Sequence, residues 1–438
     1  MRDEVVAPAF SDEDLALRFA SKHAGDLRYV SELGRWYRWD EKCWHRDTQL
    51  YAFDQVRLVC REAAKQCNDS DSRLRGITSA KTVAAVEKLA RSDQRLSATI
   101  DQWDANPWLL NTPDGVIDLR TGQLRDHRPG DHMTKMTEVA SDASCATPTW
   151  RKFLERATGE NIDLPGFLQR VLGYALTGET TEQAMFFIYG PGANGKSVLI
   201  ETAAGLMGDY AQTSPIETFT ASKFDRHPTE LARLHGARLV TATETEEGRR
   251  WAESRIKQLT GGDRVSARFM RQDFFEYRPQ FKLIFAGNHK PGLRSVDEAI
   301  KRRFNLIPFT VVIPPKERDK KLAKKLKREW PGILAWMIDG CAQWQQRGLD
   351  APQSVKDATE EYFGQEDMFT TWMEEACERL PGGWVSHPEL FQSWSWWANT
   401  AHEDCGSRPE FYRKLEDQGF IKKTIHGVRG VRGLKLRT

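Results

Sequence analysis

The sequence predicts an α/β fold: a phosphate-binding core between an N-terminal α+β domain and a C-terminal winged-helix domain. Three observations predict it. An apolar run at residues 185–189 leads into the pattern G-x-x-x-x-G-K-S at residues 190–197 and then into helix-forming residues. Two later apolar runs end in polar residues, as the strands of a parallel sheet do beside a binding site. Residues 356–438 read as helices followed by a basic hairpin.

Composition bounds the class of protein. A length of 438 residues suggests two to four domains, and a charged fraction of 29% is ordinary for a globular chain. The net charge of +2 means that any nucleic-acid surface must come from local basic patches. The seven cysteines are scattered and form no C-x-x-C pair, which disfavours a disulfide framework or a zinc ribbon. We expect reduced thiols, a cytoplasmic location in a bacterium or host, and no membrane contact, because no window reaches the roughly 18 apolar residues of a span.

The N-terminal domain is expected over residues 1–148. Ser11 caps a helix at 11–22, aromatic residues around a polar turn predict a hairpin at 29–44, and further helices are predicted at 51–67 and 78–92. Residues 68–75 read as a polar loop. Asp69 and Asp71 in that loop form a D-x-D pair of the kind that holds metals, but a solvated loop is the preferred interpretation because no apolar strand precedes it.

The second half of this domain is predicted to be a β structure. The pairs Asp114-Gly115 and Thr121-Gly122 are turn signals on either side of a strand at 116–119. Residues 141–148 have the composition of a linker, and no catalytic constellation precedes them.

The core domain is expected over residues 149–355, with two helices at 149–180 ahead of the phosphate loop. In such a loop successive N–H groups face phosphate oxygens, Lys196 reaches the β- and γ-phosphates, and Ser197 holds Mg²⁺. A glycine-rich surface turn is the alternative, and the strand and helix on either side argue against it. The predicted nucleotide-binding residues are Gly190, Pro191, Gly192, Ala193, Asn194, Gly195, Lys196, Ser197 and Val198.

Acidic residues follow the next predicted strand, at 238–243. A phosphate-loop enzyme needs a carboxylate at the end of a neighbouring strand, which completes the Mg²⁺ shell or polarises the attacking water. Glu244 is the first candidate for both the catalytic and the metal role, and Glu246 is the second. The alternative is that these acids belong to a solvated loop.

Two further catalytic candidates come later in the chain. Asn288 ends an apolar run and is placed to hydrogen-bond the attacking water or the γ-phosphate. Arg302 and Arg303 are candidates for an arginine finger that stabilises transition-state charge in a neighbouring subunit. By spacing alone, an ordinary helix-surface pair is the better interpretation of these arginines.

With these motifs in order, the sequence resembles the superfamily III helicases, and within them the helicase part of phage, plasmid and poxvirus primase-helicases. The matching segments are residues 190–197, 236–244, 257–263, 281–291 and 298–303, and a weaker similarity to the domain preceding the helicase covers residues 20–140. The resemblance implies an AAA+-like core, ATP and Mg²⁺ at the interfaces of a ring that is usually a hexamer, and translocation on single-stranded DNA. It also gives the finger role to Arg303 first and Arg302 second.

The resemblance further implies a DNA-gripping hairpin, which here covers residues 265–275. Arg268 and Arg271 are its candidates for phosphate contacts, and Phe269 and Met270 for contacts with bases. Residue types alone predict only a strand pair with a basic tip.

Two functions remain open at this point. The first is an ATP-dependent helicase that unwinds duplex and forked DNA in phage, plasmid or prophage replication. The second is an ATP-gated replication initiator or loader, which binds or melts origin DNA without processive unwinding. Many members of the family carry a primase domain ahead of the helicase and none is visible here, so a separate primase or polymerase is an expected partner.

The C-terminal domain is expected over residues 356–438. Before it, residues 316–328 read as a charged, solvated helix and residues 331–347 as a buried one. Helices are predicted near 366–379, 386–399 and 411–418, followed by a hairpin whose basic residues, Lys422, Lys423, Arg429 and Arg432, suit the wing of a DNA-binding winged helix. The alternative is a winged helix that serves only packing or protein contacts.

Overall fold

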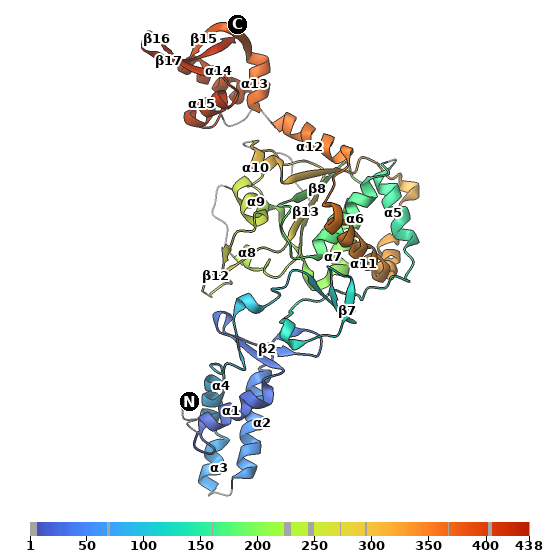
Figure 1. The fold of residues 1–438 in the computed structure, drawn as a ribbon, viewed down its shortest axis with the longest axis vertical. Coiled ribbons are helices and arrows are strands. Elements are labelled where there is room, and N and C mark those ends of the chain that lie inside the picture. Colours follow the sequence, from blue (N-terminus) through green and yellow to red (C-terminus); the bar gives the residue numbers. More distant parts are fainter. Residues whose placement is uncertain are drawn as a thin grey trace. The chain divides into compact units, whose positions relative to one another are not determined.

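The computed structural model describes residues 7–67, 71–159, 161–222, 229–243, 249–271, 273–293, 296–366, 368–401 and 405–437 (Figure 1). The chain forms two compact units. The first comprises Met1–Gly292 and Arg302–Ala358, and the second comprises Leu293–Lys301 and Thr359–Thr438.

The N-terminal region of the first unit packs helices against a small sheet. Its helices are α1 (Asp12–His23), α2 (Tyr51–Gln66), α3 (Asp71–Ile77) and α4 (Ala80–Ala90); its strands are β1 (Leu27–Val30), β2 (Arg35–Trp39), β3 (Trp44–Arg46) and β4 (Ser97–Ala98), in the order β3-β2-β1-β4. The Ser11 side chain accepts a hydrogen bond from the Asp14 amide, as predicted for an N-cap. The predicted hairpin is confirmed by the antiparallel pairing of Trp39 with Trp44.

One expectation for this region is wrong. The stretch predicted as a polar loop is helical from Asp71 onward, because Leu74 and Ile77 pack into the hydrophobic core that α1, α2 and α4 share. Tertiary burial of two apolar residues outweighs the polar composition around them. Asp69 of the D-x-D pair lies outside the described residues.

A three-stranded antiparallel sheet follows, formed by β5 (Leu109–Thr112), β6 (Gly115–Asp118) and β7 (Gln123–Arg125). Gly115 has φ +149°, and a Cβ there would lie 2.5 Å from the Arg125 carbonyl oxygen. Only glycine suits this turn, which confirms the predicted turn signal.

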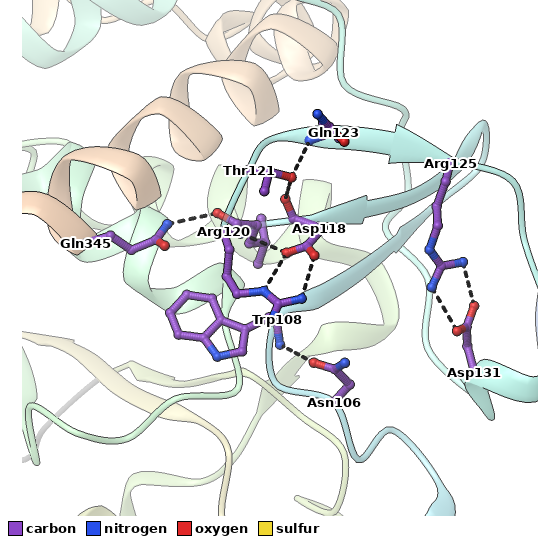
Figure 2. A network of polar contacts seen from close by, with 10 residues as sticks. Asn106, Trp108, Asp118, Arg120, Thr121, Gln123, Arg125, Asp131 and Gln345 are labelled. Atoms are coloured by element: carbon purple, nitrogen blue, oxygen red, sulfur yellow. Dashed lines mark hydrogen bonds and ion pairs between the residues drawn. The ribbon is translucent and has the colours of Figure 1, made fainter.

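Polar contacts fix this sheet and attach it to the core (Figure 2). Asp118 accepts two hydrogen bonds from Arg120, at 2.9 and 2.6 Å, and Arg125 pairs with Asp131 at 2.8 Å. Gln345, on the long helix α11 (Leu322–Arg347), donates to the Leu119 carbonyl oxygen at 2.8 Å. The sheet therefore belongs to the same packed unit as the core.

The core is a five-stranded parallel sheet, and the predicted α/β fold is confirmed. Its strands are β8 (Met185–Tyr189), β9 (Ala211–Thr213), β10 (Leu239–Thr243), β13 (Lys282–Gly287) and β14 (Phe304–Pro308), in the order β14-β8-β13-β10-β9. Each pairing between neighbours in this sheet is parallel. All six residues of β13 and the first four of β8 are buried, as expected for a sheet covered on both faces.

Helices cover this sheet and fill its connections. They are α5 (Pro148–Thr158), α6 (Leu164–Leu176), α7 (Lys196–Met207), α8 (Thr229–Ala232), α9 (Glu253–Thr260) and α11, and an antiparallel pair, β11 (Val265–Ala267) with β12 (Phe275–Tyr277), projects from the connection after α9. The two helices predicted around residue 330 are one helix of 26 residues, with Pro331 inside it. The helix continues through Pro331 because Gly340 and Cys341 pack tightly against α6.

The chain then enters α12 (Gln353–Glu366), from which the second unit follows. That unit contains α10 (Glu298–Lys301), α13 (Met368–Ala376), α14 (His387–Thr400) and α15 (Arg408–Asp417), with strands β15 (Cys377–Ser386), β16 (Ile421–Ile425) and β17 (Val428–Leu436) in the order β15-β17-β16. The three C-terminal helices and the final hairpin match the prediction. Strand β15 was not predicted, because its Pro-Gly-Gly sequence reads as a turn.

All seven cysteines are free thiols. Among the described helices, none combines the length and the apolar character that crossing a bilayer requires.

Candidate functional site

The phosphate loop leaves β8 and enters α7 in backbone conformations that favour glycine. Gly190 has φ +147° and Gly195 has φ +93°. A Cβ on Gly190 would lie 1.9 Å from the Phe309 carbonyl oxygen. A Cβ on Gly195 would lie 2.8 Å from the Phe153 ring. The loop therefore packs directly on the chain after β14 and on α5, and both glycines are sterically required.

Two side chains hold the loop from inside. Asn194 is 2% exposed and donates from Nδ2 to the Phe309 carbonyl oxygen at 2.6 Å. Lys196 donates from Nζ to the carbonyl oxygens of Gly190 and Pro191, at 2.7 and 3.1 Å. It also donates to Oδ1 of Asn194 at 3.1 Å and to Oδ1 of Asn288 at 3.0 Å. The ammonium group thus joins the loop to the end of β13.

The electrostatics of Lys196 favour an incoming anion. Burial lowers the pKa of its ammonium group, and the four printed acceptors are neutral oxygens. A neutral oxygen compensates a buried charge less well than an anion does. A phosphate oxygen that replaced these acceptors would stabilise the charged form of Lys196.

The first turn of α7 is open to an anion as well. Ser197 is exposed, Val198 is half-buried against the core, and residues 191–193 are exposed. The helix has Gly195 as its N-cap, without a side-chain capping bond, and its first turn carries no acidic residue. Its N–H groups and dipole therefore favour negative charge at this position.

The neighbouring strands bring the other predicted residues to the same edge of the sheet. Because β8, β13 and β10 are parallel neighbours, their carboxyl ends meet there. Asn288, which follows β13, is exposed and bonded to Lys196. β10 ends at Thr243. Glu244 and Glu246, the predicted catalytic and metal-binding carboxylates, lie outside the described residues.

The described ranges contain no group of three or more His, Cys, Asp and Glu side chains arranged to hold a metal. Ser197 is the predicted metal ligand within those ranges, and its exposed hydroxyl at the start of α7 suits an ion that also touches a bound phosphate.

Arg302 and Arg303 precede β14 and so lie at the opposite, amino edge of the sheet. Arg303 is 6% exposed and donates to Oγ1 of Thr260 at 3.1 Å and to Oε1 of Gln183 at 3.2 Å. Arg302 is exposed and donates to the same Gln183 oxygen at 3.1 Å. Within the chain, Arg303 is thus part of the packing, while Arg302 reaches the surface.

The predicted hairpin at residues 265–275 is present as β11 and β12, which pair Val265 with Tyr277 and Ala267 with Phe275. Residue 272 in its loop lies outside the described residues. Met270 is 69% exposed, and Arg271 is exposed with φ +61°.

The other two predicted DNA-binding residues of the hairpin pack on neighbouring rings. Phe269 stacks on Phe275, with ring centroids 5.6 Å apart, and the Arg268 guanidinium lies 4.7 Å from the Phe274 ring centroid. Phe269 also lines a cavity of about 310 Å³ together with Tyr37 and Lys135 of the N-terminal region. The base of the hairpin therefore adjoins the N-terminal region, while its tip is exposed.

The four basic residues predicted for the C-terminal hairpin are exposed and fall on both faces of it. Lys422 lies opposite Val431, which is buried in the core of the unit, whereas Arg432 lies opposite Ile421 on the other face. Because directly opposed residues share a face, Lys422 and Arg432 point to different sides of the hairpin. Lys423 and Arg429 flank Thr424 and Gly430 in the same register.

The prediction from sequence missed two buried cations at the amino edge of the sheet. Arg238 donates to the carbonyl oxygens of Leu176 and Leu109, each at 2.7 Å. Lys282 donates to the carbonyl oxygens of Thr177, Glu179 and Gln280. The available signal was a cation directly before an apolar run, in Arg238-Leu239-Val240 and in Lys282-Leu283-Ile284.

Comparisons with known proteins match two parts of the chain to family models. One, described as "D5 N terminal like", matches residues 16–159, and the other, described as "Family of unknown function (DUF5906)", matches residues 188–303.

Curated relatives come from large DNA viruses. "Putative helicase L207/L206" of Acanthamoeba polyphaga mimivirus is 26% identical over 321 residues, which is 67% of this chain and 33% of that protein. "Putative helicase 022R" of Frog virus 3 (isolate Goorha) is 26% identical over 419 residues, with shares of 75% and 43%. "Putative primase C962R" of African swine fever virus (isolate Tick/Malawi/Lil 20-1/1983) is 24% identical over 217 residues, with shares of 48% and 23%. The chain spans less than half the length of each of these relatives.

Among solved structures, the apo structure of the NrS-1 C-terminal region is similar to this chain in fold. Its TM-score is 0.50 at 9% identity, and the similarity covers 97% of this chain and 99% of that one.

Proposed function

Because the chain belongs to the superfamily III helicases of the primase-helicase type, we propose that it is an ATP-hydrolysing motor that forms a ring on DNA. In this proposal the ring, a hexamer, moves along single-stranded DNA and unwinds duplex and forked DNA in phage, plasmid or prophage replication. The core is AAA+-like, and ATP with Mg²⁺ is the cofactor. A separate primase or polymerase is the proposed partner.

One observation carries the proposal: the contact between Lys196 Nζ and Asn288 Oδ1, 3.0 Å apart, at the carboxyl edge of the sheet. It joins the phosphate loop to the end of the adjacent strand β13. Bound ATP supplies the phosphoryl group to be transferred. Lys196 then exchanges its neutral oxygen acceptors for phosphate oxygens, which frees Asn288 to orient a water.

The residues present fit the nucleotide. The loop has two positions where a Cβ would collide with protein atoms, an open helix N-terminus, and a buried lysine bonded to neutral oxygens. Ser197 would hold the metal ion, with Glu244 as its proposed companion and Glu246 as the second choice. The ion would neutralise charge on the phosphates.

The arginine finger is the part of the proposal that geometry changes. A finger acts on a nucleotide held by the neighbouring subunit and must therefore reach the surface of its own chain. Arg302 is exposed, whereas Arg303 is buried and held by Thr260 and Gln183. We assign the finger to Arg302 and a supporting role to Arg303, which reverses the preference that the resemblance gave.

The proposed DNA contacts are the tip of the β11–β12 hairpin and the C-terminal hairpin. Arg271 and Met270 are exposed at the tip and suit contacts with phosphate and base. Phe269 and Arg268 pack on rings of the hairpin itself and support the tip. The order of elements from α13 to β17, three helices and three strands, supports a winged helix in the proposed domain 356–438.

The proposed boundaries of the other two domains are 1–148 and 149–355. The contacts of Gln345 and Arg238 pack these two domains together, so we propose that they move as one body in each subunit.

Strand displacement on forked DNA tests the proposal. The purified chain with ATP and Mg²⁺ is expected to release the displaced strand, and Lys196→Ala is expected to lower ATP hydrolysis by roughly 10²–10³-fold, since one preorganised charge is lost from the site. Lys152→Ala, which removes an exposed lysine from α5, is the matched control.

Full hydrolysis by Lys196→Ala would overturn the site. ATP hydrolysis and DNA binding without strand release would instead favour the initiator or loader.

A further inference from the structure

A groove in the C-terminal unit lies between α15 and the β16–β17 hairpin. It has a volume of about 570 Å³, and its lining includes His387, Tyr412, Arg413, Lys422, Thr424 and Arg429. Lys423 also borders it, so that four cations and one carboxylate, Glu416, surround the space. The groove is therefore strongly cationic, although the whole chain carries a net charge of only +2.

The cations are divided between the two faces of the hairpin. Lys422 lies opposite Val431 and Arg429 lies opposite Thr424, on the face directed to the helices. Arg432 lies on the other face, opposite Trp384 of β15. The register thus separates residues that the sequence presents as one basic tail.

An aromatic pair forms part of the groove. The rings of His387 and Tyr412 stack with centroids 4.0 Å apart and planes 16° apart. The Tyr412 hydroxyl donates to the His387 carbonyl oxygen at 2.9 Å, which fixes the pair. Nε2 of His387 is buried and has no hydrogen-bond partner among the described residues. A buried ring nitrogen without a partner beside cations is an unsatisfied site for a ligand.

We propose that this groove binds a phosphodiester of DNA, with Lys422 and Arg429 as its cations and His387 as a donor that takes up a proton from water when the phosphate arrives. The inference rests on the proposed DNA-binding function and adds a specific site and a pH dependence to it. Glu416 pairs with Lys422 before binding and gives up this partner to the phosphate.

The charges around His387 explain the proton uptake. Burial lowers the pKa of His387, and so do Lys422 of β16 and Arg429 of β17, while Glu416 of α15 opposes them. Tyr412 and Arg413 of α15 are the other titratable groups at the groove. A phosphate that neutralises the two cations removes their effect, so the pKa of His387 rises on binding. Affinity is then highest at low pH and falls as pH rises through the pKa of the bound state.

The test measures the dissociation constant of the full chain for a DNA oligonucleotide without ATP, from about pH 5.5 to 7.5, at several salt concentrations. The wild-type constant is expected to rise by up to about tenfold per pH unit, the limit for one linked proton. His387→Gln should flatten this dependence, whereas His426→Gln, which removes an exposed histidine from the turn of the same hairpin, should keep it. A pH dependence that survives His387→Gln overturns the proposal.

A second measurement does not depend on His387. Arg429→Ala should lower the slope of log affinity against log salt by about one, the loss of one phosphate contact. Arg432→Ala should lower it less, because it lies on the other face. Equal slopes for the two variants would overturn the groove assignment.

Inorganic phosphate separates the two sources of a phosphate group. For a DNA site, millimolar phosphate should compete only weakly with the oligonucleotide. Phosphate that binds as tightly as DNA would assign the groove to the free ion and overturn the nucleic-acid proposal. ATP hydrolysis and strand displacement are scored separately, so loss of the groove with an intact motor is distinguishable from failure of the motor.

Discussion

At the carboxyl edge of the parallel sheet, Lys196 donates to two loop carbonyls and to the side-chain oxygens of Asn194 and Asn288. At the amino edge, Arg238 and Lys282 donate to main-chain carbonyl oxygens. Two of these acceptors, the oxygens of Leu176 and Thr177, lie at the C-terminal end of α6, where the helix dipole favours a cation.

Burial lowers the pKa of all three cations, so burial and pKa do not separate a binding residue from a structural one. The acceptors do. Lys196 is held by a glycine-rich loop and by the exposed side chain of Asn288, which a ligand can replace. Arg238 and Lys282 are held by main-chain oxygens that secondary structure fixes. One edge is arranged to exchange partners and the other to fasten the domains together.

The exposed exception at the amino edge gives the largest expected effect. Arg302→Ala should lower ATP turnover of the assembled oligomer by roughly 10³–10⁵, the range for an arginine finger. Arg303→Ala should act chiefly on stability, because the bonds to Thr260 and Gln183 are lost. The measurements are ATP hydrolysis, sedimentation to verify assembly, and denaturant unfolding.

Mixing provides a sharper test of action between subunits. Arg302→Ala and Lys196→Ala chains are each expected to be inactive, but a mixed ring contains interfaces with an intact loop and an intact Arg302. Turnover should therefore recover partly on mixing. No recovery in a ring that assembles normally would mean that Arg302 does not act across the interface.

The next effect concerns the fastened edge. Arg238→Ala should lower the free energy of unfolding by about 2–5 kcal/mol, because it leaves a cavity and buried carbonyl oxygens of Leu176 and Leu109 without their donor. Denaturant unfolding measures this, with Arg128→Ala, an exposed arginine of the N-terminal region, as the control. A loss no larger than that of the control would show that the amino edge does not depend on its cations.

The sequence predicts what local pattern determines. Residues 190–197 carry a fixed spacing, and the strands before and after them are apolar runs, so the core and the phosphate loop follow directly. The helix at Asp71–Ile77 was missed because its burial depends on contacts with α2 and α4. The order of Arg302 and Arg303 was uncertain for a similar reason: adjacent arginines look alike until Thr260 and Gln183 show which one is buried.

The smallest effect concerns His235, which lies beside the hairpin and lines a cavity with Tyr37 and Lys135. Its ring packs edge-on against Phe275 and Tyr277, with centroids 5.9 and 5.2 Å away. Burial is the largest cause that lowers the pKa of His235, and Lys135 adds to it, while Asp104 and Asp101 act in the opposite direction. The folded state therefore binds the proton less well than the unfolded chain does.

The sign of the pH effect follows from that difference. The stability that comes from neutral His235 is present above the unfolded pKa of about 6.5 and is lost as pH falls below it, by at most about 1.4 kcal/mol per pH unit. His235→Phe keeps an aromatic ring and removes the titration, so its free energy of unfolding should fall less between pH 7 and pH 5 than that of the wild type. His426→Gln controls for the loss of one histidine. If the wild type and His235→Phe lose stability in parallel, the junction between the N-terminal region and the hairpin does not hold a neutral histidine, and the amino side of the core is less tightly closed than its buried cations indicate.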